Sequence, residues 1–437
     1  MKKLIFLSII SFLAVLFFNG CERTELNAPT FSTGTASFAR YVAIGNSLTA
    51  GYQSGALYKS GQDYSFSALI AKQAGASFAI PYIADPGSGN RIQIARFDIG
   101  ADGSTTPVTR INPDIGAPLN LTYPMPYNNL GVPGALLYDF NNATNSTNCF
   151  SAIFGGTPNP FFDLVLRNTG TQFQQARALS PTFVTFWMGN NDVLGYATSG
   201  GTVPITPDAT FNILYGQAMD SLASLGANVV VANIPNVAVL PFLTTVGGQL
   251  MLKGTMAVFG TKADGSVGLL DLRKNYLTLN AQAELLAGKG TSPADPLSNR
   301  VVLDEGEVKT VMAAVARFNG MIAAQAAAKG FPLVDIYAEF NKIAATGTKG
   351  YYYNGQKFTV EYIRGNLFSL DGVHPSSQGA AIVANQFILK INSAFKASIP
   401  LIDVSTIPGS LVVGKNLEYS PLGIPIFEPG TFDNLLF

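Results

Sequence analysis

The segment FARYVAIGNSLT, residues 38–49, decides the fold class of this chain. Its first seven residues form a β-prone run that stops at Gly45, and polar side chains follow directly. A short run of this kind, bounded by a turn residue, is typical of a buried strand. We therefore predict a strand at residues 38–44 whose carboxyl end presents Asn46 and Ser47.

Similar runs recur along the chain and alternate with segments of helical character. Strands are predicted at residues 182–187, 228–232 and 332–337, and helices at residues 65–74, 161–179, 207–225, 307–329 and 375–395. Strands that alternate with helices form parallel βαβ units, and the helices cover both faces of the sheet. The predicted fold class is α/β: a three-layer α/β/α sandwich with a central parallel sheet.

The composition excludes several classes of protein. Of 437 residues, 47% are hydrophobic and 12% are charged, so the chain can bury a large core and wholesale disorder is excluded. Lys plus Arg equals Asp plus Glu at 27 each, so we expect no nucleic-acid partner. The chain has one His, which excludes zinc motifs that need several His, and two Cys, which excludes disulfide-dense scaffolds. Any His-dependent chemistry must therefore use His374.

The N-terminus has the pattern of an export signal. Lys2 and Lys3 precede an apolar run at residues 4–18, which is short for a membrane span. Gly20-Cys21 at its end resembles the cleavage site of a bacterial lipoprotein. That resemblance implies an acylated Cys21 as the membrane anchor, and Glu22 after it favours the outer membrane. The alternative is an ordinary signal peptide with an incidental Cys. The membrane face and the oligomeric state stay open.

The remaining chain divides into a main domain and its appendages. We expect a signal peptide at residues 1–20, a tether at 21–37, a main domain at 38–396 and a C-terminal strap at 397–437. Turn-rich polar sequence predicts one insertion near residues 80–126, and a largely uncharged stretch begins a second near residues 239–306. If Cys21 is acylated, Cys149 is a free thiol with no assigned role.

Polar residues gather where ligands bind in a parallel sheet, at the carboxyl ends of its strands. The clusters are Gly45-Asn46-Ser47-Leu48-Thr49, Gly189-Asn190-Asn191-Asp192 and Asp371-Gly372-Val373-His374, with Asn129-Leu130-Gly131-Val132-Pro133-Gly134 between the first two. In this order they resemble the four motif blocks of the SGNH (GDSL-type) hydrolase family. Asn46 departs from that pattern, since the family has Asp beside its serine.

The resemblance implies a flavodoxin-like fold and a serine hydrolase that needs no metal or cofactor. It assigns Ser47 as the nucleophile and Asp371 and His374 as the other members of a triad. The oxyanion would be held by the N–H groups of Ser47 and Gly131 and by the side-chain amide of Asn191.

The same roles follow from the chemistry of the residues. A serine hydroxyl needs a base, imidazole suits neutral pH, and a carboxylate orients the imidazole. Each preformed oxyanion donor lowers the barrier by roughly 3–4 kcal/mol. Asp335 is a rival acid at a strand end. We prefer Asp371 because one short loop can present it together with His374, and we expect Asp192 to be structural.

Each residue also has a structural interpretation. Ser47 could be a helix N-cap, Gly131 a turn glycine, Asn191 part of a turn or cap, and His374 a surface residue at a helix start. The catalytic interpretation would be wrong only if all four structural interpretations were true at once, at sites that follow one another in the family order. We therefore favour the catalytic interpretation.

The predicted function is an exported, membrane-anchored serine ester hydrolase, a lipase or esterase that acts through an acyl-serine intermediate. The substrate would be a lipid ester or an acylated glycan. The uncharged segment at residues 239–270 is either an apolar lid over an acyl pocket or a hairpin or helix of an enlarged domain. Alternatives are a carbohydrate O-acetyl esterase and, from another class, a non-catalytic surface binding lipoprotein.

Overall fold

The computed structural model describes residues 31–99, 105–124 and 126–409, and short strands at residues 418–419 and 425–426. The predicted signal peptide at residues 1–20, Cys21 and Glu22 lie outside the described residues, as does most of the predicted strap beyond residue 409.

A five-stranded parallel sheet forms the centre of the molecule. It consists of β1 (Tyr41–Gly45), β4 (Asn129–Gly131), β5 (Phe183–Trp187), β6 (Asn228–Ala232) and β11 (Leu333–Val334). The strand order is β11-β6-β5-β1-β4, and every neighbouring pair is parallel. Counted along the chain, this is the order 2-1-3-4-5 of flavodoxin-like folds. The predicted fold class is confirmed.

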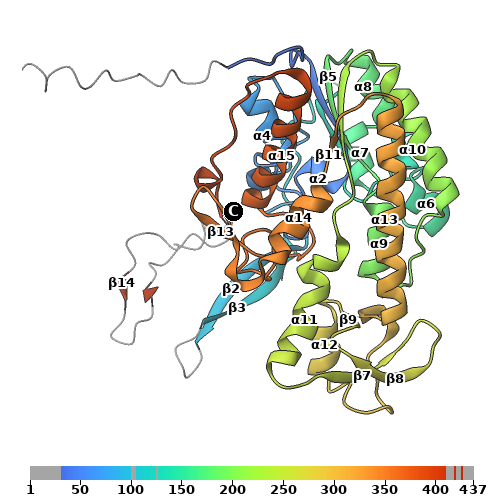
Figure 1. Ribbon diagram of the computed structural model, residues 1–437, viewed down its shortest axis with the longest axis vertical. Helices are drawn as coiled ribbons and strands as arrows, with labels where there is room; N and C mark the ends of the chain where they lie inside the picture. Colours follow the sequence, from blue (N-terminus) through green and yellow to red (C-terminus); the bar gives the residue numbers. More distant parts are fainter. Residues whose placement is uncertain (1–30, 100–104, 125, 410–417, 420–424, 427–437) are drawn as a thin grey trace, which may run out of the picture.

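Helices cover both faces of the sheet (Figure 1). On one side, α4 (Phe66–Gln73) packs against α15 (Ser377–Phe395), and on the other α10 (Asp208–Ala223) packs against α13 (Glu305–Ala328). Every residue of β1 and β5 is buried, which explains why their sequences are apolar except for Thr185. Further helices are α2 (Ser47–Ala50), α3 (Lys59–Gln62), α5 (Asp139–Asn142), α6 (Phe150–Gly155), α7 (Phe161–Leu166), α8 (Gln172–Ala178), α9 (Asn191–Thr198) and α14 (Ile336–Ala345).

Helix α13 is long and apolar enough, by length and composition alone, to cross a membrane. Its buried residues follow the helical period of three to four, with two adjacent pairs: Glu307, Val308, Val311, Ala314, Val315, Phe318, Ile322 and Ala326. This spacing places one apolar stripe toward the core. The stripe belongs to the main hydrophobic cluster together with β5 and α10, so α13 forms part of one outer layer of the sandwich.

Three predicted elements differ from the structure. The strand expected at residues 38–44 begins only at Tyr41 and ends at Gly45. The helix expected at residues 161–179 is two helices, α7 and α8, because Arg167 and Asn168 both take positive φ angles, which end a right-handed helix. The strand expected at residues 332–337 stops at Val334. The Asp335 side chain accepts the Ala338 N–H and so starts α14 at once.

Two segments extend the sandwich. Residues 80–126 contain the antiparallel hairpin β2 (Arg91–Ile99) and β3 (Thr105–Asn112). The second segment, which we call the lobe (residues 241–303), projects from the lower end in Figure 1. It contains α11 (Pro241–Leu252), β7 (Ala257–Thr261), β8 (Val267–Asp271), β9 (Tyr276–Leu277), α12 (Ala281–Leu286) and β10 (Val302–Leu303). It has a small hydrophobic core of its own, which includes Val246, Val258, Leu270 and Leu297.

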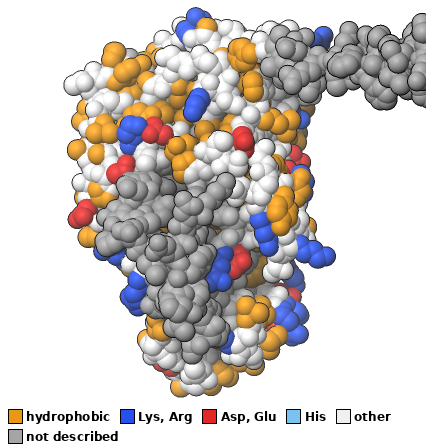
Figure 2. Space-filling view, turned by 90° about the vertical axis from the view of Figure 1, so that its left-hand side faces the viewer, with side chains coloured by type: hydrophobic (Ala, Val, Ile, Leu, Met, Phe, Trp, Pro, Cys, Tyr) orange, Lys and Arg blue, Asp and Glu red, His pale blue; other side chains and the backbone are white. Residues whose placement is uncertain are grey.

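The ends of the described chain pack on the main domain. Thr35 donates its N–H to the Phe395 carbonyl at 2.8 Å. Ile402 exchanges two hydrogen bonds with the Asn385 side chain, and residues 399–407 add four side chains to the main core. On the face shown in Figure 2, positive and negative side chains of the described residues are interspersed, as the balanced composition predicts.

Candidate active site

Ser47 lies at the carboxyl end of β1, at the first position of α2. Asn46 caps this helix, because its Oδ1 accepts the Leu48 N–H at 3.2 Å. The N–H groups of the first helical turn have no intrahelical partner, so the Ser47 N–H is available to a ligand. Ser47 is buried but retains 6% of its surface. It follows β1, which lies between β4 and β5, where the order of the strands along the chain reverses. Parallel sheets of this order bind ligands at that point.

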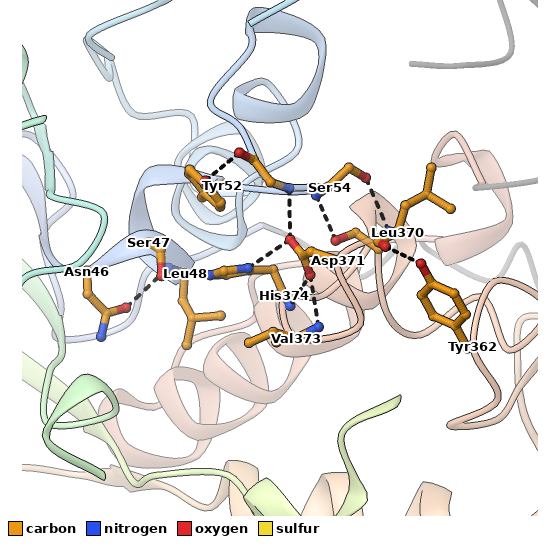
Figure 3. A network of polar contacts seen from close by, with 12 residues as sticks. Asn46, Ser47, Leu48, Tyr52, Ser54, Tyr362, Leu370, Asp371, Val373 and His374 are labelled. Carbon is orange, nitrogen blue, oxygen red and sulfur yellow. Dashed lines mark hydrogen bonds and ion pairs between the residues drawn. The ribbon is translucent and has the colours of Figure 1, made fainter. Parts of the chain in front are cut away.

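Ser47, His374 and Asp371 form one continuous chain of hydrogen bonds (Figure 3). His374 Nε2 lies 2.9 Å from Ser47 Oγ, and His374 Nδ1 lies 2.9 Å from Asp371 Oδ2. The structure thus brings together three residues that the sequence predicted to meet. In this arrangement the imidazole can take the hydroxyl proton, while the carboxylate fixes which nitrogen carries a proton.

Asp371 is held as a carboxylate by N–H donors on both oxygens. Oδ1 accepts the N–H groups of Val373 at 2.9 Å and His374 at 2.8 Å, and Oδ2 accepts the Gly55 N–H at 3.1 Å as well as the imidazole. Burial opposes the charged form, but the neighbouring imidazole and the backbone hydrogen bonds from His374 and Val373 lower the pKa of Asp371 below its ordinary value. The loop thus holds an ionised acid next to the base.

Tyr52 packs beside the imidazole and was not singled out in the sequence. Its ring centroid lies 5.0 Å from that of His374 and 6.0 Å from that of Phe161. Burial, together with the charge of Asp371, raises the pKa of Tyr52 to about 12, so the phenol stays neutral. No local pattern marks this residue, because its contact with His374 arises only in the folded chain.

An apolar pocket opens beside Ser47 and His374. Its walls come from the ends of β1, β5 and β6, from α9 and α14, and from the segment that leads into the lobe: Leu48, Trp187, Leu194, Ile234, Pro235, Val237, Leu240, Phe340 and Val373. Polar side chains are few: besides Ser47 and His374 they are Asn46, Asn190 and Asn191. A hydrocarbon group attached to an ester carbonyl would find its contacts here.

Asn191 lies in the pocket wall at the start of α9, as the sequence predicts for a strand-end residue. Its Nδ2 donates to the Ala135 carbonyl at 2.8 Å. An amide nitrogen carries two hydrogens, so one remains for a substrate oxygen.

The structure does not support the predicted role of Gly131. Its N–H donates to Asn129 Oδ1 at 2.9 Å and is therefore already used. A Cβ at this position would lie 2.4 Å from the Ala50 nitrogen, so the glycine allows β4 to pack against α2.

Gly134 is the better candidate for the backbone donor. It has a φ of +78°, and the next residue, Ala135, holds the Asn191 amide. In the part of the chain that the structure describes, no hydrogen bond uses the Gly134 N–H.

Two other predicted residues lie away from the imidazole. Asp335 accepts hydrogen bonds from Asn233 Nδ2 and from a backbone N–H of α14, so it is not the acid beside His374. Asp192 is buried and accepts the Leu137 N–H and the Thr206 hydroxyl, both at 2.9 Å. This is the structural role that the sequence predicts for it.

Cys149 is buried, with Sγ 3.2 Å from the Ser146 carbonyl oxygen. Within the described ranges, no group of three or more His, Cys, Asp or Glu side chains is placed to hold a metal ion.

Comparison with known proteins identifies the family. The model of the GDSL-like lipase/acylhydrolase family matches residues 41–387. No curated protein matches the chain. Similar solved structures include a lipase/acylhydrolase from Enterococcus faecalis, with 12% identity over 83% of this chain and 98% of that one, and a TM-score of 0.34. A mutant of an acetyl-xylooligosaccharide esterase from Geobacillus Stearmophilus has 12% identity over 82% and 96%, and a TM-score of 0.36. Likenesses this distant carry no argument about substrate.

Proposed function

The chain belongs to the GDSL-like lipase/acylhydrolase family, and on this premise we propose that it hydrolyses carboxylic esters through an acyl intermediate on Ser47. One observation carries the proposal: the 2.9 Å contact between Ser47 Oγ and His374 Nε2, with Asp371 on the other ring nitrogen. A hydroxyl becomes a nucleophile when a base takes its proton, and here the base is in hydrogen-bond contact.

The reaction has two halves. His374 Nε2 takes the Ser47 proton as Oγ bonds to the ester carbonyl carbon, and the imidazolium then protonates the leaving alcohol as its C–O bond breaks. In the second half, His374 takes a proton from water, whose oxygen bonds to the acyl carbon, and returns that proton to Ser47 Oγ as the acid leaves. Asp371 stabilises the imidazolium in both halves.

Negative charge on the carbonyl oxygen requires donors that already point toward it. We assign the Ser47 N–H, one hydrogen of Asn191 Nδ2 and the Gly134 N–H, which replaces the Gly131 N–H of our sequence prediction. The hydrogen bond from Asn191 Nδ2 to the Ala135 carbonyl supports this set, because it brings the amide next to the Gly134 backbone.

Labelling with a fluorophosphonate probe, together with hydrolysis of p-nitrophenyl esters, tests the proposal. We expect covalent labelling of Ser47 and turnover of the esters. A folded chain that neither reacts with the probe nor turns over any ester would leave the non-catalytic binding lipoprotein as the better description.

For the acyl group, we propose a chain longer than acetate. The apolar walls of the pocket beside Ser47 support this, because they offer contacts to hydrocarbon and few to sugar hydroxyls. A series of esters from acetate to octanoate decides the question. Rates that rise beyond acetate support a lipid or medium-chain ester, whereas a sharp fall beyond acetate indicates the carbohydrate O-acetyl esterase.

For localisation, we propose export and anchoring in the outer membrane through acylated Cys21. The signal-like residues 1–20 support export, and Gly20-Cys21 followed by Glu22 supports the anchor.

A further inference from the structure

A tight turn shortly after α2 reaches the loop of residues 369–374, which carries the carboxylate and the imidazole. Gln53 and Ala56 exchange both backbone hydrogen bonds, at 3.1 and 3.0 Å, so Ser54 and Gly55 occupy the central positions of the turn. Their φ angles are both positive, 50° and 80°. Two central residues with positive φ are typical of a type I′ turn.

Ser54 joins this turn to the loop by a reciprocal pair of hydrogen bonds (Figure 3). Its N–H donates to the Ser369 hydroxyl at 2.9 Å, and its hydroxyl accepts the Leu370 N–H at 3.2 Å. Gly55 can then donate its N–H to Asp371 Oδ2 at 3.1 Å, the oxygen that also contacts the imidazole. This turn, which follows the helix that begins at Ser47, is therefore connected directly to the loop that carries Asp371 and His374.

The backbone of Ser54 would suit Asn or Gly better than Ser. Positive φ is unfavourable for most residues with a Cβ, and Gly, Asn and Asp dominate the first central position of such turns. Ser54 is 7% exposed, so its hydroxyl has little contact with water. The Ser54 hydroxyl provides a hydrogen-bond acceptor for the Leu370 N–H. With Gly at this position, that N–H would have no acceptor from the turn.

We propose that Ser54 is a positioning residue, whose hydroxyl holds the 369–370 backbone against the turn and so keeps the Gly55 N–H on the carboxylate of Asp371. The carboxylate in turn orients His374. This role rests on the proposed ester hydrolysis, because Ser54 positions Asp371, the acid of that reaction, which in turn orients His374, the base.

Loss of the Ser54 hydroxyl has a specific electrostatic consequence. When the Gly55 N–H moves away from Asp371, the carboxylate directs more of its negative charge toward the imidazole, which favours the protonated imidazole. Asp371 also acts on the phenols of Tyr52, Tyr58 and Tyr362, and the guanidinium of Arg91, 3.5 Å from the centre of the Tyr58 ring, keeps its charge throughout. Burial raises the pKa of Tyr52 and Tyr362 to about 12 and also raises the pKa of Tyr58, so none of them titrates near neutral pH.

Ser54→Ala and Ser54→Gly in the full chain test the proposal. Both lack the hydroxyl, but only Gly adopts positive φ without strain, so the Gly variant should unfold at a higher temperature than the Ala variant. We expect kcat to fall on the order of tenfold in both, with KM unchanged, because the base is misplaced. His374 is the only histidine, so NMR of labelled histidine follows it without substrate. Its titration midpoint should move to higher pH in both variants.

Thr171→Ala is the matched control. Thr171 is buried and caps α8 with its hydroxyl, so its loss lowers the melting temperature without touching the 369–374 loop. We expect kcat and the histidine titration to stay at the wild-type values. If neither Ser54 variant folds, Ser369→Ala removes the other half of the reciprocal pair and should give the same two changes.

The outcomes separate this role from the proposed reaction. A histidine titration that is the same in the wild type and the Ser54 variants overturns the positioning role, and so does a loss of kcat that follows the melting temperatures. If the wild type hydrolyses no ester, the proposed reaction fails, but the histidine titration still decides the role of Ser54: a raised midpoint supports it and an unchanged one overturns it.

Discussion

Phe242, in the first turn of the lobe, donates its N–H to the Gly372 carbonyl at 2.9 Å. Gly372 lies between Asp371 and His374 in sequence. The loop of residues 369–374 is therefore contacted by two separate parts of the chain, the lobe and the turn that contains Ser54. The lobe has its own small core, and the segment leading into it contributes Val237 and Leu240 to the pocket. The pocket and the placement of the acid and base are therefore both connected to the lobe.

Gly372→Ala should disturb this contact. Gly372 has a φ of +70°, and a Cβ there would lie 2.8 Å from the Phe242 nitrogen. We expect kcat to fall on the order of tenfold or more, since the loop that holds Asp371 must shift. Gly355→Ala is the control for backbone strain alone, because its φ is +79° and a Cβ would meet nothing within 4 Å. Equal activities of the two variants would contradict a coupling between lobe and loop.

Ser47→Ala should abolish ester hydrolysis and leave the fold intact. The side chain lies at a pocket wall and its removal leaves no large cavity, whereas loss of a serine nucleophile costs roughly 10³-fold or more in kcat. Turnover of p-nitrophenyl esters and thermal unfolding measure the two effects. Near wild-type turnover in a folded Ser47→Ala variant would exclude the acyl-serine mechanism.

The convergence of Ser47 and His374 could be predicted because parallel strands bring their carboxyl ends to one edge of a sheet. Strands β1, β5 and β6 are almost entirely buried, so each reads as a mostly apolar run, interrupted only by Thr185 in β5 and preceded by Asn228 in β6. The prediction of residues 228–232 matches β6 residue for residue. The flavodoxin-like strand order came from the family resemblance, because spacing alone does not order strands.

Features that depend on contacts between distant segments could not be predicted. Strand β4 has three residues, too few for a periodic signal, and it is recognised only by its pairing with β1. The sequence around Gly131 and Gly134 does not reveal which N–H is used internally, because that depends on where the Asn129 side chain points. The role of Ser54 likewise depends on a loop more than 300 residues away.

Alanine at Gly131 should mainly reduce the amount of folded protein, whereas alanine at Gly134 should mainly reduce kcat. At Gly131 a Cβ would lie 2.4 Å from the Ala50 nitrogen of α2, so we expect mainly a loss of folded protein, with a smaller fall in kcat than at Gly134. At Gly134 a Cβ would meet only the Asn159 side-chain nitrogen at 2.9 Å, but φ is +78°, so the backbone near the proposed donor must shift. There we expect kcat to fall about 10-fold or more. Full kcat in Gly134→Ala would argue against its N–H as an oxyanion donor.

Cys21→Ala should release the chain from the membrane. If Cys21 carries the acyl anchor, its loss removes both metabolic labelling with palmitate and the membrane-bound fraction, because lipid chains provide the membrane affinity. Fractionation of wild-type and variant cells measures this, with Cys149→Ala as the matched cysteine control, since Cys149 is buried in the fold. Palmitate labelling that persists in Cys21→Ala would place the anchor elsewhere.

The stability of the protein should fall as pH rises from about 4 to 7. Burial raises the pKa of Asp192 to about 7 and that of Asp139 to about 6, above the value near 3.9 of an unfolded chain. At pH values between the unfolded and folded pKa, the folded chain holds protons that the unfolded chain has released. Each such group therefore lowers the free energy of unfolding by up to about 1.4 kcal/mol for every pH unit as pH rises. Asp371 acts in the opposite direction, because its pKa is lowered, but its contribution is lost only in more acidic solution.

Asp192→Asn separates this effect from other sources of pH dependence. The amide carries no charge, and its oxygen can still accept the Leu137 N–H, so the variant should lose less stability than the wild type between pH 5 and 8. Urea unfolding across this range measures the difference, with Asp264→Asn as an exposed control that should follow the wild-type curve. Parallel curves for the wild type and Asp192→Asn would mean that Asp192 is already ionised in the folded protein, and that its hydrogen bonds with Leu137 and Thr206 offset its burial.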